Sequence, residues 1–175
     1  MKHLLCLVSL ISLPALAQKK PVRTPIKYEL RGIVTYFSNQ STGYKADVGA
    51  TAYIIKAGIL PLDSLDTGAA EAYRSANVIY SLSTSSHTEA MLPGEETPKQ
   101  HYLSTQARLN RAIGRLSNNP TTAIATTDGQ GIFTKKLSPA TYWILIKSAG
   151  RIGAQMKKVV VSDNDIEVAA KFEVD

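Results

Sequence analysis

Cysteine is almost absent from this sequence of 175 residues, because Cys6 is its only one. Cys6 lies in an apolar N-terminal stretch that we expect to be removed from the mature protein. A mature chain without cysteine has neither disulfide bonds nor a thiol nucleophile. It must be stabilised by an ordinary hydrophobic core, and 44% hydrophobic with 19% charged residues is a typical composition for one.

Histidine is also scarce, with only His87 and His101 outside the N-terminal stretch. Neither has the spacing of a zinc site, since His87-Thr88-Glu89 lacks the one-turn separation that places two ligands on one helix face. The stretch 163–165 offers hard oxygen ligands, but too few for a calcium loop, and a hairpin turn explains it better. Asp63 and Asp66 fit the start of a helix. We therefore predict no metal site, although a weak calcium site stays open.

The motifs of nucleophilic enzymes and phosphate-binding loops are missing as well. The chain has no Gly-x-Ser-x-Gly elbow and no Ser-x-x-Lys pair. Gly129 and Gly131 precede a predicted strand rather than a helix, so they do not form a phosphate loop. Trp143 could stack on a sugar or a base, but its apolar strand favours packing in the core. The sequence thus predicts no catalytic and no cofactor-binding residue.

Basic residues are in excess without forming a basic block. The formal charge is +6 and the pI is near 9.4, yet the only basic doublets are at 19–20, 135–136 and 157–158. Solvent-exposed strand faces explain such doublets, and nucleic acid is not an expected partner.

Long hydrophobic runs occur only at the N-terminus. Lys2 and His3 are followed by an apolar run over 4–13 and by the small-x-small motif at 15–17, which is typical of a signal peptide. We predict a signal peptide over 1–17, cleaved near Ala17, and an extended lead-in over 18–27. The mature protein is then expected in the periplasm or the secreted space, with no membrane span.

What the sequence does contain is a succession of strand patterns. Turn residues at 128–131 separate two β-rich stretches within Thr126–Ile146, and at least one glycine there is expected to have positive φ. Residues 28–37, 46–55, 121–127 and 157–161 are further strand candidates. Residues 166–174 show the cleanest alternation in the chain, as expected of a sheet with one solvated face. One face has Ile166, Val168, Ala170, Phe172 and Val174, and the other has Glu167, Lys171 and Glu173.

Two helical patterns interrupt these strands. Residues 100–116 carry apolar side chains at three- and four-residue steps, and an alanine-rich stretch follows Asp63. The predicted fold is therefore a mainly β, seven-stranded sandwich over 28–175. A mostly helical insertion, at about 63–118, falls between its second and third strands.

Four stretches carry a resemblance to a known family: Gly32–Tyr36, Ala46–Ile54, Thr126–Phe133 and Leu137–Tyr142. They resemble the strands and turns of prealbumin-like (transthyretin-like) domains of the carboxypeptidase regulatory type, although Ala140 stands where that family has glycine. The resemblance covers about 100 residues and omits 63–119. It implies a seven-stranded β-sandwich found outside the cytoplasm and without an active site of its own.

Two functional hypotheses follow. The first is a non-catalytic extracytoplasmic binding or scaffold module, with a protein or cell-envelope component as partner and the insertion as contact surface. The alternative is a small transthyretin-like hydrolase or isomerase that uses His87 or His101. The hallmark Tyr-Arg-Gly-Ser of those hydrolases is C-terminal, whereas Tyr73-Arg74-Ser75 lies mid-chain and lacks the glycine. This departure favours the first hypothesis.

Overall fold

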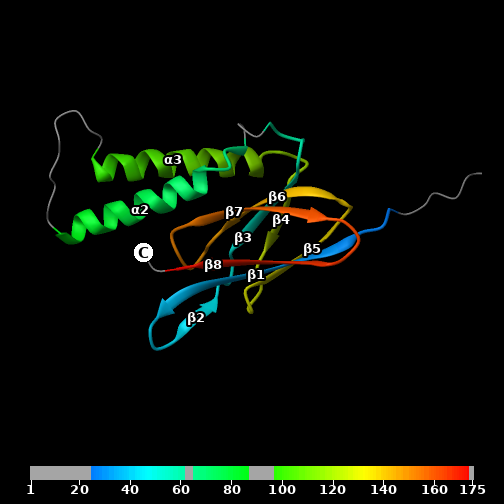
Figure 1. Cartoon of the computed structure of the whole chain (residues 1–175), viewed down its shortest axis with the longest axis horizontal. Helices are drawn as coiled ribbons and strands as arrows, with labels where there is room; N and C mark the ends of the chain where they lie inside the picture. The colour runs from blue at the N-terminus through cyan, green and yellow to red at the C-terminus, as the bar shows by residue number, and fades with distance from the viewer. Residues whose placement is uncertain (1–24, 62–64, 87–96, 174–175) are drawn as a thin grey trace, which may run out of the picture.

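The fold consists of two four-stranded sheets and two long helices, stacked as three layers (Figure 1). The structure is a computed structural model and describes residues 25–61, 65–86 and 97–173. Sheet A contains β1 (Tyr28–Asn39), β2 (Gly43–Ala46), β5 (Ile132–Leu137) and β8 (Ile166–Phe172). Sheet B contains β4 (Ala123–Thr126), β3 (Thr51–Lys56), β6 (Ala140–Lys147) and β7 (Ala154–Val161), in that order. The helices are α2 (Ala69–Ser86) and α3 (Pro98–Ser117).

Strand β1 is the centre of sheet A. It pairs antiparallel with β2 and β5 on different parts of its length, and parallel with β8. The first and last described strands are therefore neighbours. In β8 the predicted alternation is confirmed, because Val168, Ala170 and Phe172 are buried while Glu167 and Lys171 are exposed.

The core between the two sheets, here called the inter-sheet core, is built from β-branched, leucine and aromatic side chains. Its fully buried members include Leu30, Val34, Ile54, Ile144 and Ile146. At Gly32 the ring of Phe133 lies directly over the backbone. A Cβ at Gly32 would stand 1.9 Å from the nearest carbon of that ring.

A second core, here called the helix–sheet core, lies between sheet B and the helices. Ile55 and Leu145 point to this side and are fully buried against side chains of α2 and α3, among them Leu109 and Leu116. Sheet B is thus covered on both faces. The helices are not part of the inter-sheet core, but they cover one of its sheets.

The N-terminus of α3 has a complete capping box. Thr97 Oγ1 accepts the backbone N–H of Gln100 at 3.0 Å, and Gln100 Oε1 accepts the backbone N–H of Thr97 at 2.9 Å. Pro98 follows the cap, where its missing N–H has no cost. These residues start the helix two residues before the predicted 100–116.

The sandwich has eight strands rather than the predicted seven. The additional strand, β2, lies mostly between the strands predicted over 28–37 and 46–55 and includes Ala46 of the second, because its four residues carry no hydrophobic pattern. The insertion consequently falls between β3 and β4. Val48, which lies within the strand predicted over 46–55, precedes β3 and is 55% exposed.

Helix α2 extends to Ser86, and α3 begins at Pro98. No helix in the described ranges is long and apolar enough to cross a membrane. The predicted signal peptide and most of the lead-in lie outside the described residues.

Candidate binding surfaces

The turn that precedes β5 has the geometry that the sequence predicted. Gly131 has φ +73°, and Asp128 Oδ1 accepts the backbone N–H groups of Gln130 at 2.9 Å and Ile132 at 3.0 Å. The hydrogen bond from Ile132, followed by that from Gln130, lowers the pKa of Asp128. The carboxylate therefore serves the turn.

Asp47 is fully buried, and both of its carboxylate oxygens are used within the fold. One accepts the hydroxyl of Ser148, and the other accepts the N–H groups of Ala149 at 3.1 Å and Gly150 at 2.8 Å. Asp47 thereby fixes the β2–β3 connection to the loop between β6 and β7. Sequence reasoning used Asp47 only as part of a family pattern and did not predict this anchoring role.

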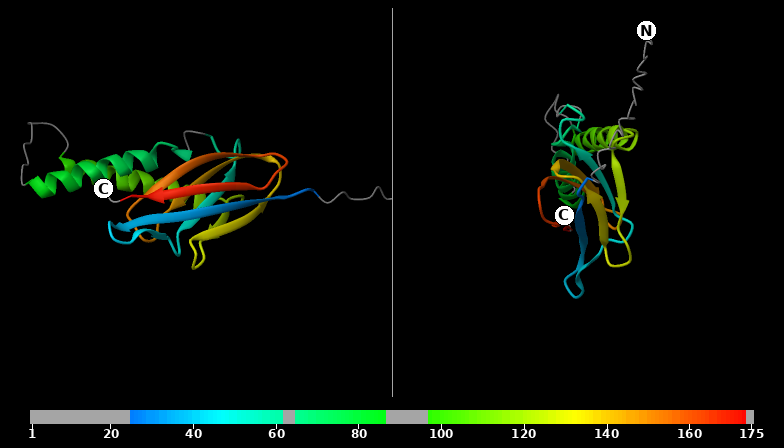
Figure 2. Two further views of the ribbon diagram at one scale, coloured as in Figure 1. Left: turned by 60° about the horizontal axis from the view of Figure 1, so that its bottom comes forward. Right: turned by 90° about the vertical axis from the view of Figure 1, so that its right-hand side faces the viewer.

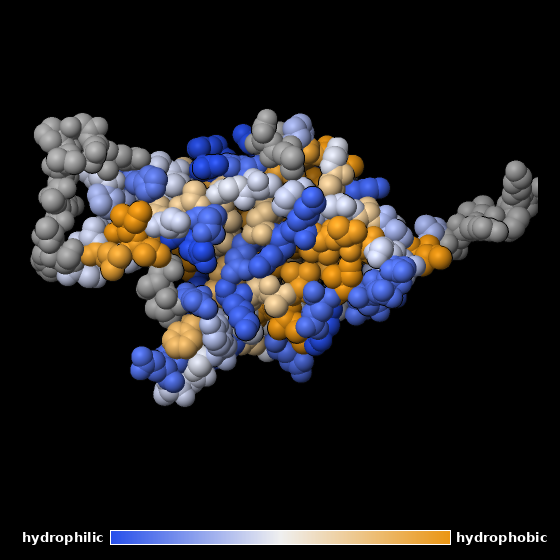
Figure 3. All heavy atoms as spheres, in the orientation of Figure 1, coloured by the Kyte–Doolittle hydropathy of each residue, from blue (hydrophilic) through white to orange (hydrophobic). Residues whose placement is uncertain are grey.

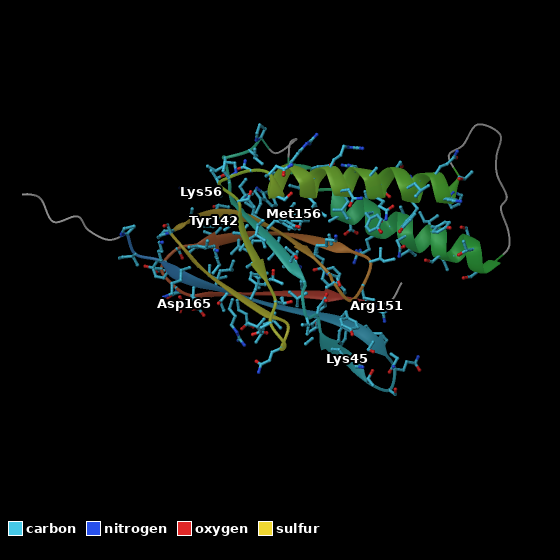
Figure 4. The ribbon with its side chains drawn as sticks, turned by 180° about the vertical axis from the view of Figure 1, so that it is seen from behind. Lys45, Lys56, Tyr142, Arg151, Met156 and Asp165 are labelled. Atoms are coloured by element: carbon cyan, nitrogen blue, oxygen red, sulfur yellow. The ribbon has the colours of Figure 1, made fainter. Side chains whose placement is uncertain are left out.

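Arg151 holds the same loop from its other end (Figure 4). Its Nη2 donates to the carbonyl oxygens of Phe37 at 2.8 Å and Ser38 at 3.1 Å, and its guanidinium lies 5.6 Å from the ring centroid of Tyr36. The β6–β7 loop is therefore fixed by side chains at both ends and belongs to the rigid part of the sandwich.

The helical hairpin formed by α2 and α3 is joined internally by tyrosines. The hydroxyls of Tyr73 and Tyr102 are 3.0 Å apart, and the ring of Tyr80 stacks on Tyr102 at a centroid distance of 5.1 Å. Burial, followed by the hydrogen bond with Tyr102, raises the pKa of the Tyr73 hydroxyl above its ordinary value. At the base of the hairpin, Arg108 Nε donates to Asp66 at 2.7 Å.

The distal half of the hairpin, here residues 79–86 and 98–103, extends beyond the ends of the strands (Figure 2). Ile79, Leu82 and Leu103 lie there with 48%, 65% and 49% of their surface exposed. Figure 3 shows a hydrophobic patch over this part of α2. A single exposed apolar side chain is normal on a protein surface, whereas a contiguous exposed apolar patch marks an interaction site.

A shallow groove of about 500 Å³ runs between α2 and the edge strands β7 and β8. Arg74, Lys157 and Lys171 line it, and Glu71 accepts a hydrogen bond from Arg74 at 2.8 Å. The two edges are linked because Gln155 Nε2 donates to the carbonyl oxygen of Lys171. The groove therefore carries three basic side chains and one acidic one, and Arg74 and Glu71 are paired within it.

The structure describes only some of the residues considered above for metal binding. His101 lies in the first turn of α3, while His87 and Asp63 lie outside the described residues. The stretch 163–165 forms the turn between β7 and β8, where Asp165 Oδ1 accepts the N–H of Glu29 at 2.7 Å. Within the described ranges, no group of three or more His, Cys, Asp or Glu side chains is placed to hold a metal ion.

Trp143 was predicted to pack in the core, and the structure places it at the margin of the helix–sheet core. It is partly buried there and lines an open basin at the end of sheet B.

Comparison with known proteins shows only distant likeness. No protein-family model matches the sequence, and no curated protein matches it significantly. Among solved structures, a candidate carbohydrate-binding protein from Pseudomonas aeruginosa is 16% identical. The match covers 84% of this chain and 89% of that chain, with a TM-score of 0.41.

The pilus backbone protein RrgB of Streptococcus pneumoniae is also 16% identical, over 85% of this chain and 41% of that chain, with a TM-score of 0.33. The full-length major pilin RrgB gives the same TM-score over 83% of this chain and 30% of that chain. This chain therefore spans less than half of the pilus protein. Likeness at this level assigns no family, and the prealbumin-like assignment stays a prediction from the sequence.

Proposed function

We propose that this protein is a non-catalytic binding or scaffold module that acts outside the cytoplasm, in the periplasm or the secreted space. In this proposal the β-sandwich is a rigid support, and the distal half of the helical hairpin is the surface that contacts another protein. The observation that carries the proposal is the exposure of Ile79, Leu82 and Leu103 on helices that extend beyond the sheets.

The hairpin is held in a defined orientation. Its base is packed on sheet B through Leu109 and Leu116, and the pair formed by Asp66 and Arg108 closes one side of that base. A partner that binds the distal half therefore meets a preorganised surface, which reduces the entropy lost on binding.

The charge of α3 indicates the chemistry of the partner. Residues 98–117 contain Lys99, Arg108, Arg111 and Arg115 and no acidic residue, and the three arginines are exposed. Lys99 lies in the distal half, and the arginines lie nearer the base of the hairpin. An apolar patch followed along α3 by basic side chains fits a protein surface with an apolar centre and carboxylates on one side of it. We commit to such an acidic protein surface as the partner.

Site-specific photo-crosslinking tests the proposal. A crosslinking amino acid at Leu82 or at Leu103 should capture the same discrete protein in cell-envelope extract. The same group at Val48, which is as exposed but lies on the sandwich, should not capture it. Equal capture from all three positions would contradict a contact surface on the hairpin.

The captured protein is then purified and its affinity measured. The double variant Ile79→Ser with Leu82→Ser should weaken binding about tenfold or more, because the apolar contact is lost. The separate variant Arg111→Glu should also weaken binding, most strongly at low salt, where charges are screened least. Val48→Ser is the matched control and should bind as the unaltered protein does. Unchanged affinity in the double variant would overturn the proposal.

A further inference from the structure

An open basin of about 670 Å³ lies on the outer face of sheet B, beyond the region that the helices cover. Trp143 and Thr141 of β6 and Lys158 of β7 form one part of its lining, and residues 57–61 after β3 form the other. Its volume is in the range of ligand-binding pockets. Lys56 and Tyr142, which are neighbours of these residues in the chain, lie at the end of the sandwich opposite the hairpin tip (Figure 4).

Lys158 is directly opposite Trp143 in the register of β6 and β7, and its Nζ lies 5.8 Å from the centroid of the indole ring. Lys158 is exposed and is the only charged residue that lines the basin among the described residues. A cation–π contact at an exposed site is weak. The ammonium group can therefore leave the ring for an anion and uncover the indole face.

Strand addition at β6, which carries Trp143, is not open to a ligand in this basin. β6 is an interior strand of sheet B, hydrogen-bonded to β3 on one side and to β7 on the other. A peptide that added a strand would need a free sheet edge. A ligand over Trp143 must instead be recognised by side chains, with a flat apolar face for the indole and one anionic group for Lys158.

We propose that this basin binds one uronic-acid residue of an acidic polysaccharide. The C–H face of the pyranose ring stacks on the indole of Trp143, and the sugar carboxylate pairs with Lys158. Thr141 lies two residues before Trp143 on the same face of β6, and its hydroxyl hydrogen-bonds a hydroxyl of the sugar. The single cation matches one carboxylate per sugar residue. The site is separate from the hairpin surface and independent of the function proposed above.

Intrinsic fluorescence gives a direct test, because Trp143 is the only tryptophan of the chain. Trigalacturonate is titrated into the full chain at low salt, and its methyl ester, which has the same rings without the charges, is the matched ligand. We expect a saturable change in emission with trigalacturonate and none with the ester. Emission that stays unchanged up to about 10 mM trigalacturonate would overturn the proposal.

Two lysine variants separate a site from general charge attraction. Lys158→Met keeps an unbranched side chain and removes the charge, and it should weaken binding about tenfold. Lys157→Met makes the same change one residue earlier, in the groove beside α2, and should leave the affinity unchanged. Equal weakening in both variants would show non-specific attraction to a basic protein and would overturn the site. Circular dichroism of each variant confirms that the comparison is between folded proteins.

Discussion

The two hydrophobic cores share sheet B but are built from different side chains. The inter-sheet core contains Phe133 and a set of branched residues from both sheets. Alanines make up four of the ten buried residues of the helix–sheet core, beside large side chains such as Leu65, Leu109 and Leu116, and three of the fifteen of the inter-sheet core. Alanine buries little apolar area, so the helix–sheet core contributes less stability per buried residue than the inter-sheet core does.

The comparison indicates which layer supports the other. The inter-sheet core is closed by strands from both ends of the described chain, since β1 pairs with β8. The helices pack on sheet B, on each other and on the segment before α2, which supplies Leu65 and Asp66, and their distal half has no sheet beneath it. We therefore expect the sandwich to be the stable unit and the helical layer to depend on it.

The largest effect is expected from Phe133→Ala. It removes a buried ring that lies over Gly32 and should lower the free energy of unfolding by about 3–5 kcal/mol. Leu116→Ala is the matched change in the helix–sheet core, and should cost about 2–4 kcal/mol, mostly for the helical layer. Denaturant melts followed by circular dichroism measure both. A larger loss for Leu116→Ala would reverse the comparison.

Gly131→Ala should lower the free energy of unfolding by about 2–3 kcal/mol. The positive φ is unfavourable for alanine, and its Cβ would stand 2.4 Å from the carbonyl oxygen of Val34, a backbone atom that cannot easily move. Gly129→Ala is the control in the same turn, because Gly129 has space around it and no positive φ. Its stability should stay within about 0.5 kcal/mol of the unaltered protein. Equal costs at the two positions would contradict the described turn.

The smallest effect is a pH dependence at the base of the hairpin. The hydrogen bond from Arg108 lowers the pKa of Asp66, and the charges of Arg115 and Arg111 add to this effect. The Asp66 carboxylate therefore binds a proton less tightly in the folded protein than in the unfolded chain. The stabilisation is complete well above the ordinary carboxyl pKa near 3.8 and is lost as the pH falls through the lowered value.

Thermal melts of the unaltered protein and of Asp66→Asn check this dependence between about pH 6 and pH 3. The difference in Tm should be largest at pH 6 and should shrink as the medium becomes acidic. A difference that grows towards low pH would have the wrong sign for this pair.

The sequence predicted the strands whose side chains alternate and the helix with regular apolar spacing. It missed β2, whose four residues are polar or small, and the second half of α2, where Ser81, Ser83, Thr84 and Ser85 obscure the helical pattern. In α2 these hydroxyls hydrogen-bond to backbone carbonyls of the preceding turn, such as Tyr80 O and Ser81 O. Packing against α3, where the ring of Tyr80 stacks on Tyr102, supports a helix that local preference does not favour.

The helix–sheet core is visible in the sequence as a pattern other than strand alternation. Ile54-Ile55 and Trp143-Ile144-Leu145-Ile146 are continuous apolar runs, which indicate strands buried on both faces. The basin beside Trp143 could not be predicted in the same way. It depends on the register that places Lys158 opposite Trp143 and on the path of residues 57–61.

Native-state hydrogen exchange tests the dependence of the helical layer on the sandwich most directly. The amides of α2 should exchange through an opening with a lower free energy than those of β1, β3 and β6, which should approach the global value. Leu116→Ala should lower the opening free energy of α2 and leave that of β1 nearly unchanged. If α2 and β6 exchange with the same free energy, and Leu116→Ala lowers both equally, the two cores form one cooperative unit and this account is wrong.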